Sequence, residues 1–180
     1  MAPNARSDSS EPDWPRDIFA ALTAQQVRQV AYVPDAGHAA LLELCAGDDD
    51  MEMVPLTTEE EGIALLAGAW LGGQRGVLLM QSSGLGNCVN MLSLTQTCRF
   101  PLLMLVTMRG QWGEFNPWQV PMGRISADVL RLTGNLVFAA ESPAEVGETV
   151  AAAARMVFEG PAGAAVLIGQ RVVGVKTFTH

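Results

Sequence analysis

The sequence of 180 residues predicts one α/β domain, built on an open six-stranded parallel sheet with helices on both faces. Short runs of Val, Leu and Ile alternate with longer helical stretches along the chain. These apolar runs are continuous and do not alternate with polar residues, which indicates strands buried on both faces. Aromatic residues make up only 6% of the chain while Gly and Ala are abundant, and this composition suits close-packed α/β layers.

The first half of the chain predicts three strands, each reached through a helix. The apolar runs predict strands at residues 30–33, 51–56 and 76–80. The helical stretches lie at residues 15–29, 36–46 and 59–71. A polar turn at residues 47–50 ends the second of these helices, and the glycine-containing turn at residues 72–75 ends the third.

The second half repeats the pattern with a longer irregular stretch. A glycine loop at residues 82–87 opens a helix that runs to Arg99, and Pro101 breaks the chain before the next strand. The remaining predicted strands are residues 102–107, 135–139 and 164–169. Residues 108–121 read as irregular, and the remaining helices are predicted at residues 125–132 and 143–158.

Composition and charge exclude several classes of protein. The net charge of −8, with 11 basic residues and no basic run, argues against nucleic acid as the main partner. No stretch is apolar and long enough to span a bilayer. Residues 1–14 are polar and contain proline, so we expect a disordered lead before a single domain at residues 15–180. Three cysteines without CxxC spacing predict free thiols in a reducing cytoplasm and no metal site.

Four loops follow predicted strands and carry unusual polar residues or glycines. They are residues 34–38, 57–61, 81–87 and 108–122. In open parallel sheets, ligands bind where loops leave the carboxyl ends of the strands. The sequence therefore predicts a binding site formed by these loops.

The acidic run Glu59-Glu60-Glu61 opens a helix whose body is almost entirely small or apolar. Charges that complement the helix dipole account for one or two of these glutamates. They do not account for a helix that is apolar on every side, which is typical of a buried helix. We therefore expect at least one carboxylate to be carried out of bulk water, and the helix to contact another chain as well as its own sheet.

The other candidate residues each have two readings. The loop Ser82-Ser83-Gly84-Leu85-Gly86-Asn87 is either an anion cradle at a helix start or a capped tight turn. His38 is either a proton shuttle or a capping residue at the surface. Arg109 is either a clamp for an anionic substrate or the partner of Glu114 in an ion pair. Trp112 and Trp118 either wall a pocket or cover the edge of the core.

Together these loops resemble the pyrimidine-binding domain of thiamine-diphosphate enzymes, and more closely the α subunit of sulfopyruvate decarboxylase and the matching half of phosphonopyruvate decarboxylase. The similar segments are the EEEG helix start, the Met-Gln strand end followed by SGLGN, an RG…GE loop and a Q-x-PMG segment. Here they are residues 59–62, 80–87, 109–114 and 119–123. The combination is far more specific than any one segment.

The resemblance implies roles for individual residues. The family glutamate hydrogen-bonds to the pyrimidine ring of thiamine diphosphate, and it corresponds to Glu60. The cofactor pocket would be lined by Gln81, Ser82, Ser83, Gly84, Leu85 and Asn87. His38 and Asp35 are the candidates for proton transfer. The substrate end would be shaped by Arg109, Trp112, Glu114 and Trp118.

The resemblance also implies a missing half. The family holds diphosphate and Mg²⁺ on a domain with a GDG motif, which this chain lacks. We therefore expect a β subunit to supply that half of a hetero-oligomer. The implied reaction converts a small anionic 2-oxo acid to an aldehyde and CO₂. The alternatives are carboligation within the same family and a non-catalytic regulatory or binding subunit with the same fold. Asp35 stands where these decarboxylases usually have Cys or Ser, and residues 115–118 are bulky and apolar, so the 2-oxo acid stays open.

Overall fold

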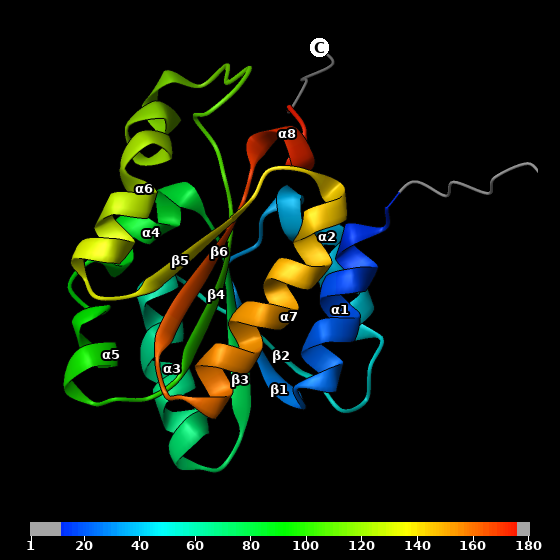
Figure 1. The fold of residues 1–180 in the computed structure, drawn as a ribbon, viewed down its shortest axis with the longest axis vertical. Helices are drawn as coiled ribbons and strands as arrows, with labels where there is room; N and C mark the ends of the chain where they lie inside the picture. The colour runs from blue at the N-terminus through cyan, green and yellow to red at the C-terminus, as the bar shows by residue number, and fades with distance from the viewer. Residues whose placement is uncertain (1–11, 176–180) are drawn as a thin grey trace, which may run out of the picture.

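The computed structural model describes residues 12–175, and this part of the chain forms one six-stranded sheet in which every strand pair is parallel. The strand order is β2-β1-β3-β4-β6-β5 (Figure 1). The strands are β1 (Val27–Tyr32), β2 (Glu52–Pro55), β3 (Arg75–Gln81), β4 (Leu102–Thr107), β5 (Leu136–Ala140) and β6 (Gly163–Ile168). The predicted fold class is confirmed.

Helices cover both faces of this sheet, as Figure 1 shows. One layer consists of α1 (Trp14–Ala24), α2 (Ala39–Ala46) and α7 (Pro143–Glu159). The other consists of α3 (Glu59–Leu71), α4 (Ser82–Cys88), α5 (Ser93–Thr97) and α6 (Val120–Leu132). Shorter turns are η1 (Ala36–His38), η2 (Pro117–Gln119) and α8 (Gln170–Val173).

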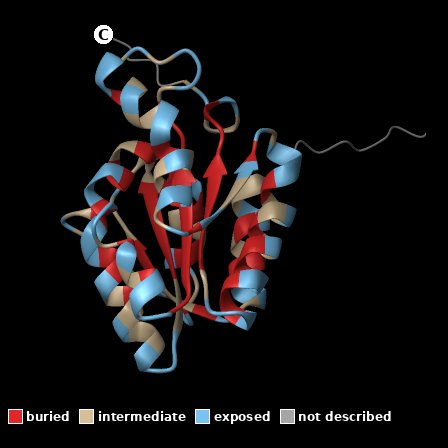
Figure 2. Ribbon diagram, turned by 60° about the vertical axis from the view of Figure 1, so that its left-hand side comes forward, coloured by how far each residue is buried: buried red, intermediate tan, exposed pale blue. Residues whose placement is uncertain are grey.

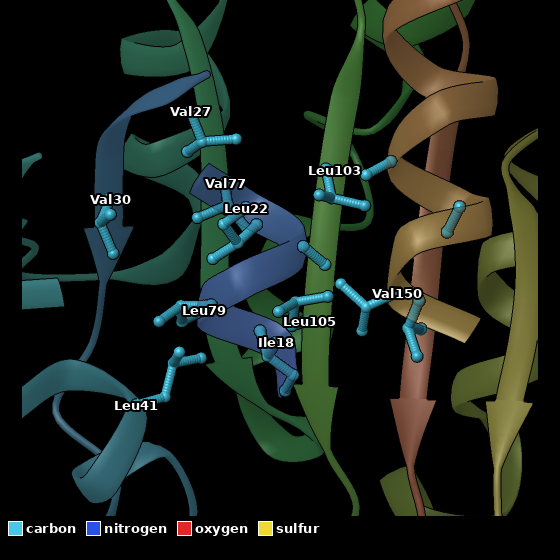
Figure 3. Packing of buried hydrophobic residues seen from close by; sticks show 14 of the residues in the cluster. Ile18, Leu22, Val27, Val30, Leu41, Val77, Leu79, Leu103, Leu105 and Val150 are labelled. Atoms are coloured by element: carbon cyan, nitrogen blue, oxygen red, sulfur yellow. The ribbon is translucent and has the colours of Figure 1, made fainter. Parts of the chain in front are cut away.

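The core consists of two apolar layers separated by the sheet. Figure 2 shows that the buried residues gather on the central strands and on parts of the helices around them. Side chains alternate between the faces of a strand, so Val77 and Leu79 of β3 enter one layer while Leu78 and Met80 enter the other. Figure 3 shows the first layer, in which Leu22 of α1 packs over β3 and β4. Burying each such side chain contributes roughly 1.5–3 kcal/mol to the stability of the fold. Every residue of β4 and of β6 is buried. These two strands therefore form a rigid centre for the loops at their carboxyl ends.

Several element boundaries differ from the predicted ones. α1 ends at Ala24, not at residue 29, because Gln26 adopts a positive φ of 55° and Val27 already begins β1. The predicted helix to Arg99 is broken into α4 and α5, where the hydroxyls of Ser93 and Thr95 bond to carbonyls of the intervening turn.

The region after β4 is more ordered than predicted. α6 begins at Val120, five residues before the predicted start. Pro121 lies in its first turn, where backbone N–H groups have no acceptor within the helix, so proline costs no hydrogen bond there. α8 was not predicted. At the other end, α1 begins at Trp14 with Asp13 as its cap, and residues 1–11 of the predicted lead lie outside the described residues. None of the helices within residues 12–175 has both the length and the apolar character that crossing a bilayer requires.

Candidate active site

The carboxyl ends of β1, β3 and β4 lie side by side at one edge of the sheet. From β1 the chain moves outward to β2, then returns to form β3 on the other side of β1. Such a reversal of strand order opens a crevice between the loops that leave the two strands. The loops after β1, β3 and β4 are therefore brought together here, together with the start of α3.

The start of α3 directs its three glutamates in three different directions, because successive helical residues are rotated by about 100°. Glu59 is buried, with 8% of its surface exposed. Glu61 turns back and accepts a hydrogen bond from the Thr57 N–H at 2.9 Å. Glu60 is exposed. The family resemblance implies the cofactor role for Glu60, whereas within this single chain the buried carboxylate at the helix start is that of Glu59, one residue earlier.

Glu59 is held against the glycine loop at the start of α4. Asn87 donates a hydrogen bond from Nδ2 to Glu59 Oε2 at 2.9 Å. Glu59 Oε1, Cδ and Cγ pack directly against the Cα of Gly84, where a Cβ would overlap all three atoms. The glycine in this position is therefore needed for close approach of a carboxylate, and the loop works as a cradle for Glu59 as well as a turn.

A hollow of about 210 Å³ lies beside Glu59. It is lined by Val33, Pro34, Asp35, Glu59, Gln81 and Ser83. These residues come from the loop after β1, the start of α3, the end of β3 and the start of α4, which lie far apart along the chain. A smaller cavity of about 70 Å³ adjoins it, and Asp35 lines both. The walls of the smaller cavity are Asp35, Ala36, Gly37, Arg109, Val173, Gly174 and Val175.

Asp35 is the acceptor at the centre of a polar network. Its Oδ2 accepts hydrogen bonds from Thr107 Oγ1 at 2.7 Å and from the Gly37 N–H at 3.1 Å. Its Oδ1 accepts from Gln81 Nε2 at 3.0 Å. Gln81 Oε1 in turn accepts from Ser83 Oγ at 2.8 Å and from Gln119 Nε2 at 2.9 Å. The network thus links the ends of β1, β3 and β4 to η2.

Arg109 and Glu114 form a buried bidentate ion pair. The guanidinium donates to Glu114 from Nε at 2.7 Å and from Nη2 at 2.6 Å, and both side chains are at most 6% exposed. The backbone N–H groups of Gly110 and Asn116 also donate to this carboxylate. The hydrogen bonds from Arg109 are the main cause that lowers the pKa of Glu114 to about 2. Of the two readings of Arg109, the ion pair with Glu114 is the one that the structure shows.

The loop that carries this pair is tied down by α8. Gln170 Oε1 accepts hydrogen bonds from the backbone N–H groups of Gln111 and Trp112, both at 2.9 Å, and its Nε2 donates to Glu114. Trp112 is half exposed beneath the guanidinium of Arg171, and Trp118 is 65% exposed. Neither tryptophan lines the two cavities described above.

His38 lies below the site, within the core. Only 1% of it is exposed, and its Nε2 is 3.2 Å from the Leu105 carbonyl oxygen and 3.4 Å from that of Met80. Within residues 12–175 its buried Nδ1 has no hydrogen-bond partner. Burial lowers the pKa of His38, so the ring is neutral near pH 7. The structure therefore places this residue as a link between η1 and the sheet, outside both cavities.

The remaining residues of the glycine loop divide into lining and supporting positions. Ser82 is buried and its Oγ accepts a hydrogen bond from the Arg109 N–H at 3.0 Å, while Leu85 belongs to the core. Thr107 and Gln170 were not among the predicted site residues, whereas Glu59 was named only within the acidic run and Gln119 only as part of a motif. Each of these makes its contacts with residues distant along the chain, so a local pattern carried little signal. Within residues 12–175 no group of three or more His, Cys, Asp or Glu side chains is placed to hold a metal ion.

Residues 15–115 match the family model of the thiamine pyrophosphate enzymes, N-terminal TPP binding domain. The chain belongs to this family. The resemblance drawn from the loop motifs is thereby confirmed, and the cradle around Glu59 is part of a thiamine pyrophosphate enzyme domain.

Individual relatives agree with this membership. The chain is 39% identical over 144 residues to the sulfopyruvate decarboxylase subunit alpha of Methanothermobacter thermautotrophicus, covering 79% of this chain and 84% of that protein. The subunit of the same name from Methanococcus maripaludis is 36% identical over 129 residues, covering 71% of this chain and 77% of that protein. The phosphonopyruvate decarboxylase of Streptomyces viridochromogenes is 41% identical over 118 residues, covering 64% of this chain but 30% of that protein.

A solved structure shares the fold at low sequence identity. It is the 2-oxoglutarate:ferredoxin oxidoreductase from Magnetococcus marinus with 2-oxoglutarate, coenzyme A and succinyl-CoA bound. The TM-score is 0.64 at 12% identity, and the match covers 93% of this chain and 31% of that chain. The likeness supports the α/β architecture of the thiamine pyrophosphate enzyme domain.

Proposed function

We propose that this chain is the α subunit of a heteromeric thiamine-diphosphate-dependent decarboxylase, which converts a 2-oxo acid to an aldehyde and CO₂. The observation that carries the proposal is the buried carboxylate of Glu59, held at the wall of a cavity between the ends of β1 and β3. The family membership and the names of the relatives support the same reaction class.

The residues around this cavity fit the pyrimidine half of the cofactor. Asn87 holds Glu59 Oε2, and Oε1 is aligned along the glycine loop by its packing on Gly84. We assign to Glu59, in place of Glu60, the hydrogen bond to the pyrimidine ring nitrogen that the family resemblance implies. A hydrogen bond made by a carboxyl group away from bulk water is strengthened by the low local dielectric. When bound, thiamine diphosphate supplies the electron sink for the loss of CO₂.

Asp35 is the group best placed for proton transfer. It lines both cavities, whereas His38 lies beneath them and is held neutral by burial. Gln81 and Ser83 line the first cavity beside it. Arg109 reaches the second cavity with its charge already matched by Glu114, so we assign it to positioning the substrate end. Trp112 and Trp118 would shape that end from outside, where a partner chain would cover them.

A β subunit is proposed to hold the diphosphate and Mg²⁺ and to complete the site in a cytoplasmic hetero-oligomer. Both sulfopyruvate decarboxylase relatives described above are named subunit alpha, and this chain covers most of the length of each. The match to the phosphonopyruvate decarboxylase covers only 30% of that protein, which leaves room there for a second half. The small exposed residues Ala64 and Gly68 of α3 offer a close-packing surface for such a partner.

The test is co-expression with a subunit that carries a GDG motif, followed by assay of CO₂ release from a panel of 2-oxo acids. We expect Glu59→Gln to lower kcat by about 10²–10⁴-fold, the range of lost acid–base catalysis. Glu60→Gln is the matched control, because it makes the same chemical change on the exposed side of the same helix turn. Calorimetric titration with thiamine diphosphate gives a second readout.

The outcomes separate the possible functions. Equal effects of the two variants, or full activity of Glu59→Gln, would contradict the role of Glu59. Acyloin formation in place of aldehyde release would assign the complex to carboligation. Cofactor binding without turnover of any 2-oxo acid would favour a non-catalytic subunit.

A further inference from the structure

We propose that Gln119 is a positioning residue, which acts through the amide of Gln81 to hold Asp35 as the ionised hydrogen-bond acceptor of the cavity. The juxtaposition that carries this inference is the chain of hydrogen bonds from Gln119 to Gln81 to Asp35, at 2.9 and 3.0 Å. The chain of bonds exists whatever the substrate is. Only the importance of Asp35 for turnover rests on the proposed function.

The direction of these hydrogen bonds is set by the carboxylate. An ionised carboxylate accepts hydrogen bonds and cannot donate them, so Gln81 must turn its NH₂ group toward Asp35. Its carbonyl oxygen then faces Gln119 and Ser83, and both must donate to it. Gln119 therefore turns its own NH₂ group toward Gln81, and every bond along the chain donates toward Asp35.

This direction leaves an unpaired acceptor at the Gln119 end of the chain of hydrogen bonds. Gln119 is 5% exposed, and within residues 12–175 its buried Oε1 has no hydrogen-bond partner. An unsatisfied buried acceptor destabilises a fold, because the group has lost its water and gained nothing in return. If both amides were reversed, Oε1 would accept from Gln81, but Gln81 would turn its carbonyl oxygen toward Asp35. That arrangement requires a proton on Asp35, so the unpartnered Oε1 is a consequence of the ionised state.

Other charged groups face Asp35 and set its environment together with the amides. Arg109 lines the smaller cavity with it, and the charge of Arg109 is matched by Glu114. Glu59 lines the larger cavity, and His38 follows in η1 with its buried ring. The Gln81 amide, the Thr107 hydroxyl and the Gly37 N–H donate to Asp35, and each of these donors stabilises a negative charge on it.

The test is Gln119→Glu, which keeps the shape of the side chain and reverses the polarity of its contact with Gln81. The carboxylate introduced at position 119 and that of Asp35 would then compete for the single NH₂ group of Gln81. Gln119→Met removes the donor without competition, since Ser83 still donates to Gln81. The control is Gln96→Glu, where an exposed amide that donates to the Gly134 carbonyl at 2.9 Å undergoes the same chemical change.

The measurement is a ¹³C NMR titration of aspartate carboxyl groups in the full-length chain, with the Asp35 signal assigned by Asp35→Asn. We expect the pH midpoint of Asp35 to rise in Gln119→Glu, by about the tenfold gain in proton affinity that losing a charge-assisted hydrogen bond produces. The rise should be smaller in Gln119→Met and absent in Gln96→Glu. A carboxylate at position 119 also repels Asp35 directly, so the deciding comparison is among the wild type, Gln119→Met and the double variant Ser83→Ala/Gln119→Met. A contact that serves packing alone would leave the midpoint unchanged in both of these variants, and this result would overturn the inference.

A second measurement applies if Gln119→Glu does not fold. Ser83 and Gln119 donate to the same oxygen of Gln81, so either donor alone keeps its orientation. The double variant Ser83→Ala/Gln119→Met should therefore raise the midpoint by more than the sum of the two single variants. Strict additivity would overturn the inference. Because the titration needs neither cofactor nor substrate, its failure is distinguishable from failure of the decarboxylase proposal.

Discussion

The substitution Gly84→Ala tests the cradle of Glu59 directly. The new Cβ would overlap the Oε1, Cδ and Cγ atoms of Glu59, so the carboxylate must leave its place beside the cavity. Gly84 does not have a positive φ, and the backbone itself therefore accepts alanine. We expect the overpacking to destabilise the fold by about 1–3 kcal/mol. A displacement of a reacting group by about 1 Å can lower turnover about 10²-fold, and we expect a loss of at least that size.

Gly86→Ala is the matched control in the same short helix. Its Cβ would meet the Met122 Sδ at 3.4 Å, which is ordinary van der Waals contact with a flexible side chain. We expect stability to stay unchanged or to rise by up to about 1 kcal/mol, since alanine restricts the unfolded chain. The assays are thermal unfolding of both variants, calorimetric titration with thiamine diphosphate, and CO₂ release by the reconstituted complex. Wild-type cofactor affinity and turnover in Gly84→Ala would refute the placement of Glu59.

Further predictions concern the loop after β4 and the thiols. The pKa of Glu114 is lowered from 4.5 to about 2 in the folded chain. The ionised Glu114 carboxylate therefore stabilises the fold fully above pH 4.5, and this stabilisation is lost as the pH falls toward 2. The free energy of unfolding should decrease by roughly 3 kcal/mol over that window, and Glu114→Gln should flatten this dependence in denaturant titrations. Gln170→Leu should increase hydrogen exchange at the Gln111 and Trp112 amides, which lose their acceptor, and unchanged exchange would contradict the tie between α8 and the loop. A thiol reagent should label Cys98 selectively in the native chain, because Cys98 is exposed while Cys45 and Cys88 are buried. Burial also raises the pKa of Cys45 to about 11 and that of Cys88 to about 12, which keeps both thiols protonated and unreactive. Rapid native labelling of all three cysteines would be inconsistent with the packing described.

Much of the site could be predicted because its loops directly follow strands along the sequence. The four loops nominated from the sequence all follow strands of one parallel sheet, and parallel strands place their carboxyl ends at a common edge. The glycine at position 84 and the asparagine at position 87 were assigned to the cofactor pocket. The structure gives them a more specific part, since they position the carboxylate of Glu59.

The identity of the buried glutamate could not be read from the pattern. Glu59, Glu60 and Glu61 are chemically identical neighbours, and a shift of one residue rotates a helical side chain by about 100°. Their burial depends on where α4 packs against α3, and that contact joins residues 28 positions apart, Glu59 and Asn87. The clamp and the ion-pair readings of Arg109 were likewise both open, because only the tertiary structure places Glu114 within 2.7 Å of it.

By itself the sequence determined the layered α/β architecture, the succession of six strands and most of the helices along the chain, and the family to which the chain belongs. These follow from hydrophobic periodicity and from local motifs, which act over a few residues. The tertiary structure decided which carboxylate is dry, that Arg109 is already paired, and that Gln119 meets Gln81 across 38 residues. The physical reason is that burial and hydrogen-bond direction belong to contacts between segments, and such contacts exist only once the sheet has assembled.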